Sequence, residues 1–130
     1  MPHDLFLAAK AAMKNAHAPY SRFPVGAAIR TTDGRVFSGC NVEIASFPEG
    51  WCAETTALGH YIMGGGGEIA EIAVIAERMA KVTPCGGCRQ RLAEFAPADA
   101  KVYLCDAAGV AETVTMGELL PHGFEGGVLT

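Results

Sequence analysis

The chain opens with apolar residues at helical spacing, which predicts a helix over 5–16 that stops at Pro19. Two segments with strand character follow at 25–31 and 35–41, and Thr32-Asp33-Gly34 between them is typical of a hairpin turn. Because a turn this short cannot join parallel strands, we expect this pair to be antiparallel.

The middle of the chain alternates helix and strand patterns. Residues 52–63 predict a helix that a run of four glycines closes, and 69–77 predicts a buried strand. Thr83 is suited to be the N-cap of the next helix, with Pro84 in its first position, and this helix is expected to run to about Phe95. Strand–helix–strand units of this kind imply parallel pairing with right-handed crossovers.

Two further short strands are predicted at 101–105 and 110–115, and the short turn between them again implies antiparallel pairing. Thr115 and Glu118 fit a capping box for a short last helix before Pro121. The order of elements, α-β-β-α-β-α-β-β-α, predicts an α/β fold with three α-β-α layers, in which helices cover both faces of a mixed five-stranded sheet.

The composition is that of a folded protein. Half of the 130 residues are apolar and 18% are charged, so disorder is disfavoured and a single domain over 1–130 is expected. No apolar run approaches the ~20 residues that a membrane span requires, and the N-terminus, Met1-Pro2-His3-Asp4, lacks the pattern of a signal peptide. We therefore expect a cytoplasmic protein without membrane association, whose five cysteines stay reduced and bind metal more readily than they pair.

The net charge of −4 bears on the partners of the protein. Binding to a nucleic-acid backbone relies on clustered Lys and Arg that displace counterions, and the ten basic residues here are scattered. The charge pattern therefore disfavours nucleic acid as a partner and favours a small neutral molecule as the substrate.

Two cysteine motifs carry the candidate chemistry, Cys52-Ala53-Glu54 and Pro84-Cys85-Gly86-Gly87-Cys88. Their three thiols could hold one zinc ion, and three protein ligands leave a fourth position for water, as in catalytic zinc sites. A metal ligand, one residue and a non-ligand Glu, followed by Pro-Cys-x-x-Cys, is the signature of zinc deaminases, in which the Glu is the general acid and base. The motifs therefore predict a hydrolytic deaminase with Cys52, Cys85 and Cys88 as zinc ligands and Glu54 as the catalytic residue.

Two other interpretations of the cysteines stay open. One is a closed structural zinc site, in which Cys40, Cys105 or a histidine provides a fourth ligand. Cys40 and Cys105 fall in predicted strands without a CxxC partner, where a buried thiol is ordinary, and no histidine has ligand spacing to the cysteines. The other is a redox CxxC pair, and the nearby Cys-x-Glu motif favours zinc over it.

The chain resembles the small, homotetrameric cytidine deaminases through most of its length. Five blocks carry the resemblance and occur in family order: Tyr20-Ser21-Arg22-Phe23-Pro24-Val25-Gly26-Ala27-Ala28, Gly39-Cys40-Asn41-Val42-Glu43, Cys52-Ala53-Glu54, Pro84-Cys85-Gly86-Gly87-Cys88-Arg89-Gln90, and Glu118-Leu119-Leu120-Pro121 with Phe124. The resemblance implies the three-layer fold predicted above, one zinc ion per subunit, and a homotetramer whose sites are shared between subunits.

The resemblance also implies roles for residues around the site. Phe23 would stack on the pyrimidine ring, and Asn41 and Glu43 would hydrogen-bond the ribose hydroxyls. The backbone N–H of Ala53 would meet the base carbonyl, and Phe124 would reach the pocket of a neighbouring subunit.

Three positions depart from the family pattern, because Ile44 replaces an Asn, Phe47 a Tyr and Thr55 an Arg. Phe47 stays among the expected substrate-binding residues, although it lacks the hydroxyl of one contact near the sugar. The family Arg offsets the negative charge that three thiolates place on zinc. Without it, helix N-termini and Arg89 are the groups that remain for this role.

Motifs and resemblance together predict zinc-dependent deamination of free cytidine and 2′-deoxycytidine to uridine, 2′-deoxyuridine and ammonia, in pyrimidine salvage. Three alternatives stay open: a modified or non-standard aminopyrimidine nucleoside, as in blasticidin S deaminases; a tRNA or polynucleotide substrate; and a structural zinc module without chemistry. The three departures motivate the first alternative. The acidic balance and the short turn at 106–109 oppose the second, and the third needs a fourth protein ligand.

Overall fold

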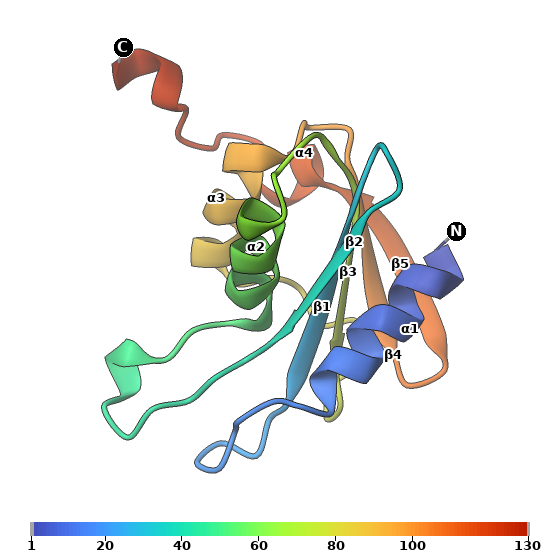
Figure 1. Ribbon diagram of the computed structural model, residues 1–130, viewed down its shortest axis with the longest axis vertical. Helices are drawn as coiled ribbons and strands as arrows, with labels where there is room; N and C mark the ends of the chain where they lie inside the picture. The colour runs from blue at the N-terminus through green and yellow to red at the C-terminus, as the bar shows by residue number, and fades with distance from the viewer. Residues whose placement is uncertain (1, 130) are drawn as a thin grey trace.

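Helices cover both faces of a five-stranded sheet, so the molecule has three layers (Figure 1). The computed structural model describes residues 2–129. The strands are β1 (Val25–Thr31), β2 (Val36–Cys40), β3 (Ile69–Ala76), β4 (Lys101–Asp106) and β5 (Gly109–Thr115). The helices are α1 (Pro2–Met13), α2 (Ala53–Met63), α3 (Gly86–Phe95) and α4 (Met116–Leu119), with the 3-10 helices η1 (Phe47–Glu49) and η2 (Gly126–Leu129). The predicted three-layer α/β fold is confirmed.

The strand order is β2-β1-β3-β4-β5. The hairpins β1–β2 and β4–β5 are antiparallel, as their short turns require, and β3 and β4 are parallel, as the α3 crossover between them implies. β1 lies between β2 and β3 and is antiparallel to both. The parallel strands that α2 connects, β2 and β3, are therefore separated by one strand, and α2 packs on β1 and β2.

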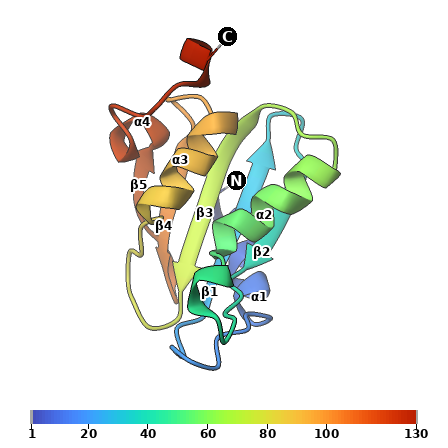
Figure 2. The ribbon, with the colours of Figure 1, turned by 90° about the vertical axis from the view of Figure 1, so that its left-hand side faces the viewer.

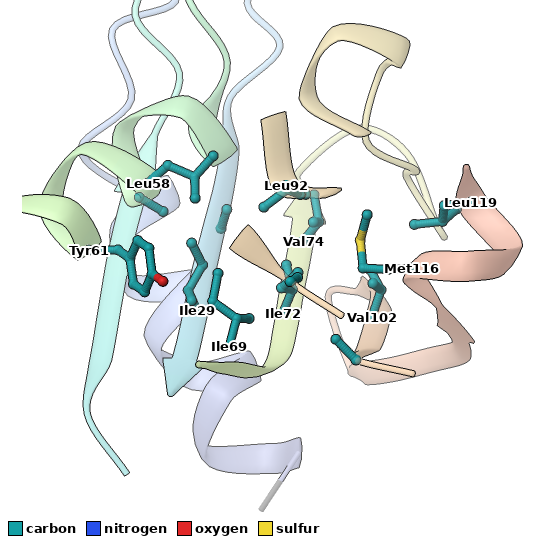
Figure 3. Close-up of a cluster of buried hydrophobic side chains, with 14 of the residues drawn as sticks. Ile29, Leu58, Tyr61, Ile69, Ile72, Val74, Leu92, Val102, Met116 and Leu119 are labelled. Atoms are coloured by element: carbon teal, nitrogen blue, oxygen red, sulfur yellow. The ribbon is translucent and has the colours of Figure 1, made fainter. Parts of the chain in front are cut away.

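Alternation along the strands divides the core into two layers. On one face, strand residues pack against α2, α3 and α4 in the cluster of Figure 3, which includes Ile29, Leu58, Ile72, Val74, Leu92 and Val102. On the other face, the alternate strand residues pack against α1. This second cluster includes the strand residues Ala28, Ala73 and Ile75 and the helix residues Leu5, Phe6, Ala9 and Met13. The two helices that follow the cysteine motifs thus share one face of the sheet, and α1 covers the opposite face.

Helix α2 approaches β2 closely at Gly39. A Cβ atom at this position would lie 2.4 Å from the backbone nitrogen of Ala57 and 2.7 Å from the carbonyl oxygen of Ala53. No side chain fits in that space, so glycine is required for α2 to lie at this depth on the sheet. The depth of α2 in turn sets the height of its first turn, where the Cys-x-Glu motif lies.

Two predicted helix boundaries were wrong. Helix α1 begins at Pro2 and ends at Met13 rather than spanning 5–16. Its C-terminal end tightens, because the amides of residues 14–16 bond to carbonyls three residues back. Helix α3 begins at Gly86 with Cys85 as its N-cap, so Thr83 and Pro84 precede the helix rather than begin it. Cys85 has φ −67° and ψ 168°, an extended conformation that the first helical residue could not adopt.

The predicted capping box at the last helix is confirmed. The Thr115 hydroxyl accepts from the Glu118 backbone N–H at 3.2 Å, and the Glu118 carboxylate accepts from the Thr115 N–H at 2.9 Å. After α4 the chain leaves the sheet, and Figure 1 shows this last segment, in red, extending away from the rest of the molecule. None of the helices within residues 2–129 has the length and apolar character needed to cross a membrane.

Candidate metal centre and active site

The three motif cysteines come together at the starts of two neighbouring helices. Cys52 is the N-cap of α2, Cys85 is the N-cap of α3, and Cys88 lies in the first turn of α3. Figure 2 shows α2 and α3 side by side on one face of the sheet. The three Sγ atoms all lie within 4.8 Å of one another, and those of Cys52 and Cys85 are 3.7 Å apart. The structure thus brings the three motif thiols together, and their role as zinc ligands stays a prediction.

This spacing fits a zinc ion. Zn–S bonds of about 2.3 Å at tetrahedral angles place two ligand sulfurs ~3.8 Å apart, close to the separation of Cys52 and Cys85. A hydrogen bond from Cys88 lowers the pKa of Cys52, and the same bond, with burial, raises the pKa of Cys88. Metal binding to thiols requires their deprotonated form, and a bound cation offsets the repulsion between thiolates that lie this close.

The other two cysteines lie outside the cluster. Cys105 is buried among the residues that contact α1, on the opposite face of the sheet, and burial raises its pKa to about 11. Cys40 is partly buried at the end of β2, where burial also raises its pKa. Within residues 2–129, no fourth His, Cys, Asp or Glu joins the cluster. The described part of the chain therefore does not form the closed four-ligand site.

Glu54 lies in the first turn of α2, beside the thiols. It is 4% exposed, and it lines the same cavity as Cys52 and Cys85. Burial raises the pKa of its carboxyl group, and the positive charge of Arg91 acts in the opposite direction. Burial thus favours the protonated form of this carboxyl, and a carboxyl that holds its proton more tightly is suited to be a general acid as well as a base.

The cavity in front of the thiols has a volume of about 580 Å³. Its walls are mainly apolar with a few polar groups, as in many small-molecule sites. The lining residues are Tyr20, Ser21, Val25, Asn41, Val42, Glu43, Ile44, Phe47, Gly50, Trp51, Cys52, Ala53, Glu54, Val74, Val82, Thr83 and Cys85. The structure thus brings Asn41, Glu43, Phe47 and Ala53, four of the residues predicted to bind substrate, to one cavity with Glu54.

Asn41 and Glu43 hold the 20–25 segment, which lines part of the cavity, in place through side-chain hydrogen bonds. The Asn41 amide accepts from the Val25 N–H and donates to the Phe23 carbonyl, both at 2.9 Å. The Glu43 carboxylate accepts from the backbone N–H groups of residues 20 and 21, at 3.0 and 3.1 Å, and from the Ser21 hydroxyl. The bonds from Ser21 lower the pKa of Glu43, so its carboxylate is ionised at neutral pH.

Two residues predicted to contact substrate do not line this cavity. The half-buried Phe23 lies in the segment that Asn41 holds, but it is not among the lining residues. Phe124 is 64% exposed in the segment after α4, where the Gln90 side chain bonds to its backbone N–H and carbonyl. Both roles stay predictions, and that of Phe124 concerns a neighbouring subunit.

Two aromatic residues of the cavity were not predicted from the sequence. Trp51 precedes Cys52, and its indole N–H donates to the Thr56 hydroxyl at 2.7 Å. Tyr20 packs edge-on against Phe47 with ring centroids 5.5 Å apart. Trp51 directly precedes Cys52, so the sequence could have predicted that it lies near the site. The contact between Tyr20 and Phe47 depends on how two loops fold together and could not have been predicted in this way.

The arginine that contacts the thiols was also assigned to the wrong position. The Arg89 guanidinium donates to the carbonyls of Pro84, at 2.7 Å, and Leu119, at 3.0 Å. It is Arg91 that reaches a motif cysteine, with Nη1 3.7 Å from the Cys88 Sγ. Residues three apart share a helix face, so the spacing of positions 88 and 91 was the signal that could have identified this contact.

Known proteins share both the sequence and the fold. The chain matches the family model described as the cytidine and deoxycytidylate deaminase zinc-binding region over residues 2–105. It is 47% identical to a cytidine deaminase of Halalkalibacterium halodurans over 113 residues, which are 87% of this chain and 86% of the relative. It is 40% identical to a cytidine deaminase of Sporosarcina psychrophila over 120 residues, covering 92% and 88%. The crystal structure of a cytidine deaminase from Burkholderia pseudomallei superposes with a TM-score of 0.89 at 44% identity, covering 95% of this chain and 99% of that one.

The chain therefore belongs to the cytidine and deoxycytidylate deaminase family. These comparisons confirm the predicted resemblance, the predicted fold and the prediction of a deaminase enzyme. The matched zinc-binding region contains all three clustered cysteines, so the family and the geometry both point to zinc.

Proposed function

We propose that the protein deaminates free cytosine nucleosides, converting cytidine and 2′-deoxycytidine to uridine, 2′-deoxyuridine and ammonia in pyrimidine salvage. The observation that carries this proposal is the buried Glu54 beside three clustered thiols in a cavity of about 580 Å³. Such a cavity has room for one nucleoside. The names of the similar proteins support the substrate class.

In this proposal Cys52, Cys85 and Cys88 hold one zinc ion per chain. A zinc ion bound there lowers the pKa of water and so makes it a nucleophile near neutral pH. The starts of α2 and α3 add partial positive charge beside the thiolates, which stabilises their ionised form.

Glu54 carries the protons. Its carboxylate takes a proton from the attacking water and passes it to ring N3, which makes C4 of the base electrophilic. The water oxygen bonds to C4, and Glu54 then moves the second proton from that oxygen to the amino group, so that the C4–N bond breaks, ammonia leaves and the oxygen remains as the C4 carbonyl. One carboxyl group can serve both steps because it is a base before the attack and an acid after it.

The other cavity residues orient the nucleoside. The Ala53 backbone N–H, at the start of α2, meets the base carbonyl. Asn41 and Glu43 bind the ribose hydroxyls with the hydrogen-bonding capacity that remains after they hold the 20–25 segment. Phe23 stacks on the base, and Phe47 contacts the sugar side of the cavity.

The active form in this proposal is a homotetramer with shared sites. Cys85 is exposed in the single chain, although it belongs to the proposed metal centre. Phe124 is 64% exposed, in a segment that extends away from its own subunit. A neighbouring copy that inserts Phe124 over the cavity mouth would cover both groups.

The test is ultraviolet absorbance of the zinc-loaded protein with cytidine and 2′-deoxycytidine, with Glu54→Gln as the inactive control. Conversion of both cytosine nucleosides to uracil nucleosides, absent in the control, is the expected result. Light scattering on the same sample should report four chains. An absence of conversion by a zinc-loaded tetramer would contradict the proposed substrate.

A second candidate substrate is a modified aminopyrimidine nucleoside. It is favoured by the position of Ile44 and Phe47, because both departures from the family pattern line the cavity. The same assay with blasticidin S decides between the candidates. Faster turnover of blasticidin S than of cytidine would favour the second one.

A further inference from the structure

The positively charged guanidinium of Arg91 contacts one of the clustered sulfurs. Its Nη1 lies 3.7 Å from the Sγ of Cys88, the buried member of the cluster, and both residues lie on α3. Thr55 approaches the same sulfur from α2 with its hydroxyl, also at 3.7 Å. The sulfur of Cys88 is therefore contacted by a neutral hydroxyl from one helix and by a guanidinium from the other.

The local packing accommodates the Arg91 guanidinium. A Cβ atom added at Gly87 would lie 3.1 Å from Nη1 and 3.7 Å from Cζ of Arg91, so the absence of a side chain at Gly87 leaves space for the guanidinium. Among the described residues, no carboxylate forms an ion pair with Arg91. Its charge therefore acts without a direct ion pair on the groups around it, which are the Cys88 sulfur and, at longer range, the Glu54 carboxyl.

The charge balance of the proposed site explains how this contact would stabilise it. Three thiolates and one Zn²⁺ sum to −1, and hydrogen bonds to ligand sulfurs from the surrounding shell stabilise such a unit. A charge-assisted hydrogen bond is stronger than a neutral one, so the guanidinium contributes more than the Thr55 hydroxyl. The Arg91 side chain is exposed, however, and solvent screening reduces its effect.

We propose that Arg91 is a positioning residue of the metal centre, which offsets the charge of the thiolate ligands through its contact with Cys88 and so slows the loss of zinc. This inference rests on the zinc site of the proposed function and adds a residue outside both cysteine motifs to it. Loss of a hydrogen-bonding partner of a metal ligand typically costs 10–100-fold in metal affinity, and because Arg91 is exposed we expect the lower end, about 10-fold.

The experiment measures the rate at which a chromogenic chelator removes Zn²⁺ from the zinc-loaded protein. Arg91→Gln is expected to release zinc about 10-fold faster than wild type. Arg91→Lys, which keeps the charge, should fall between the two. The matched control is Lys14→Gln, which makes the same change in net charge at an exposed position just after α1, the helix on the opposite face of the sheet.

The outcomes separate this inference from the proposed function. If wild type holds no zinc, the zinc site itself is wrong. If wild type holds zinc, and Arg91→Gln releases it no faster than Lys14→Gln, the role of Arg91 is overturned while the zinc site stands. Equal release rates for the Gln and Lys variants at position 91 would also overturn it, because charge would then have no effect. The thermal midpoints of the metal-free variants check that none of the differences reflects unfolding.

Discussion

The cavity has two walls that are built in different ways. The metal wall consists of the first turns of α2 and α3, so its thiols and Glu54 are fixed by helices that pack on the sheet. The substrate wall consists of loops at 20–25 and 41–51, joined by side-chain hydrogen bonds to backbone groups. Three aromatic side chains on that wall are largely exposed: Tyr20 at 51%, Phe47 at 70% and Trp51 at 46%.

This difference separates the chemistry of the site from its selectivity. The groups of the metal wall stand at the starts of packed helices, and each of them has a defined role in the proposed reaction. The substrate wall offers exposed surface that another ligand, or another subunit, can cover. Changes to the metal wall should therefore abolish turnover, whereas changes to the substrate wall should alter affinity and stability by smaller amounts.

The largest effect is expected from Cys85→Ala. This substitution removes one of three proposed ligands, so zinc content should fall to near zero and activity to background. The fold should persist, because the Cys85 side chain makes no capping hydrogen bond at the start of α3. Metal analysis, circular dichroism and the absorbance assay on one sample test this. Full zinc content in this variant would show that Cys85 is not a ligand.

Glu54→Gln should keep zinc and lose at least ~10²–10⁴-fold in turnover, because the amide cannot carry the proton. The burial that raises the pKa of Glu54 also opposes its ionisation in the folded state. The metal-free wild type should therefore lose stability as pH rises above the ordinary value of 4.5, since the folded state holds the proton more tightly than the unfolded state. Metal-free Glu54→Gln lacks this loss, so its melting temperature should exceed that of wild type increasingly with pH.

Glu43→Gln tests the substrate wall. The pKa of Glu43 is lowered by its bonds with residues 20 and 21, so its contribution to stability is present above the ordinary value of 4.5 and is lost as pH falls through the folded-state pKa. The melting temperature of Glu43→Gln should lie below that of wild type at pH 7, and the difference should shrink below pH ~4.5. Activity should fall through a higher KM. A constant difference at all pH values would mean that the carboxylate charge does not hold the wall.

The smallest effect is expected from Phe47→Tyr. The side chain is 70% exposed, so the added hydroxyl has free access to water, and stability should change by no more than about 0.5 kcal/mol. If position 47 contacts the sugar, KM for cytidine should change while kcat stays constant. An unchanged KM would remove Phe47 from the substrate wall.

The sequence was sufficient for the metal wall and insufficient for much of the substrate wall. The spacing of Cys85 and Cys88 and the Cys-x-Glu motif are local patterns, and helix starts place such residues in a predictable way. The meeting of Tyr20 with Phe47 depends on two loops that approach each other only in the folded chain. Likewise, the sequence indicated Arg89 as the arginine near the thiols. The sequence could not show that the Arg89 guanidinium instead bonds to the carbonyls of Pro84 and Leu119, because these bonds depend on tertiary packing.

The glycine at position 39 has a consequence for how natural variants should be interpreted. It lines no part of the cavity, yet a single added methyl group would push α2 outward through its contacts with Ala53 and Ala57. The same helix positions Cys52 and Glu54, so a variant at Gly39 would resemble an active-site lesion in a survey of activity alone. A substitution at position 39 is thus expected to reduce activity in the same way as a substitution of an active-site residue, although it alters only the packing of α2 on the sheet.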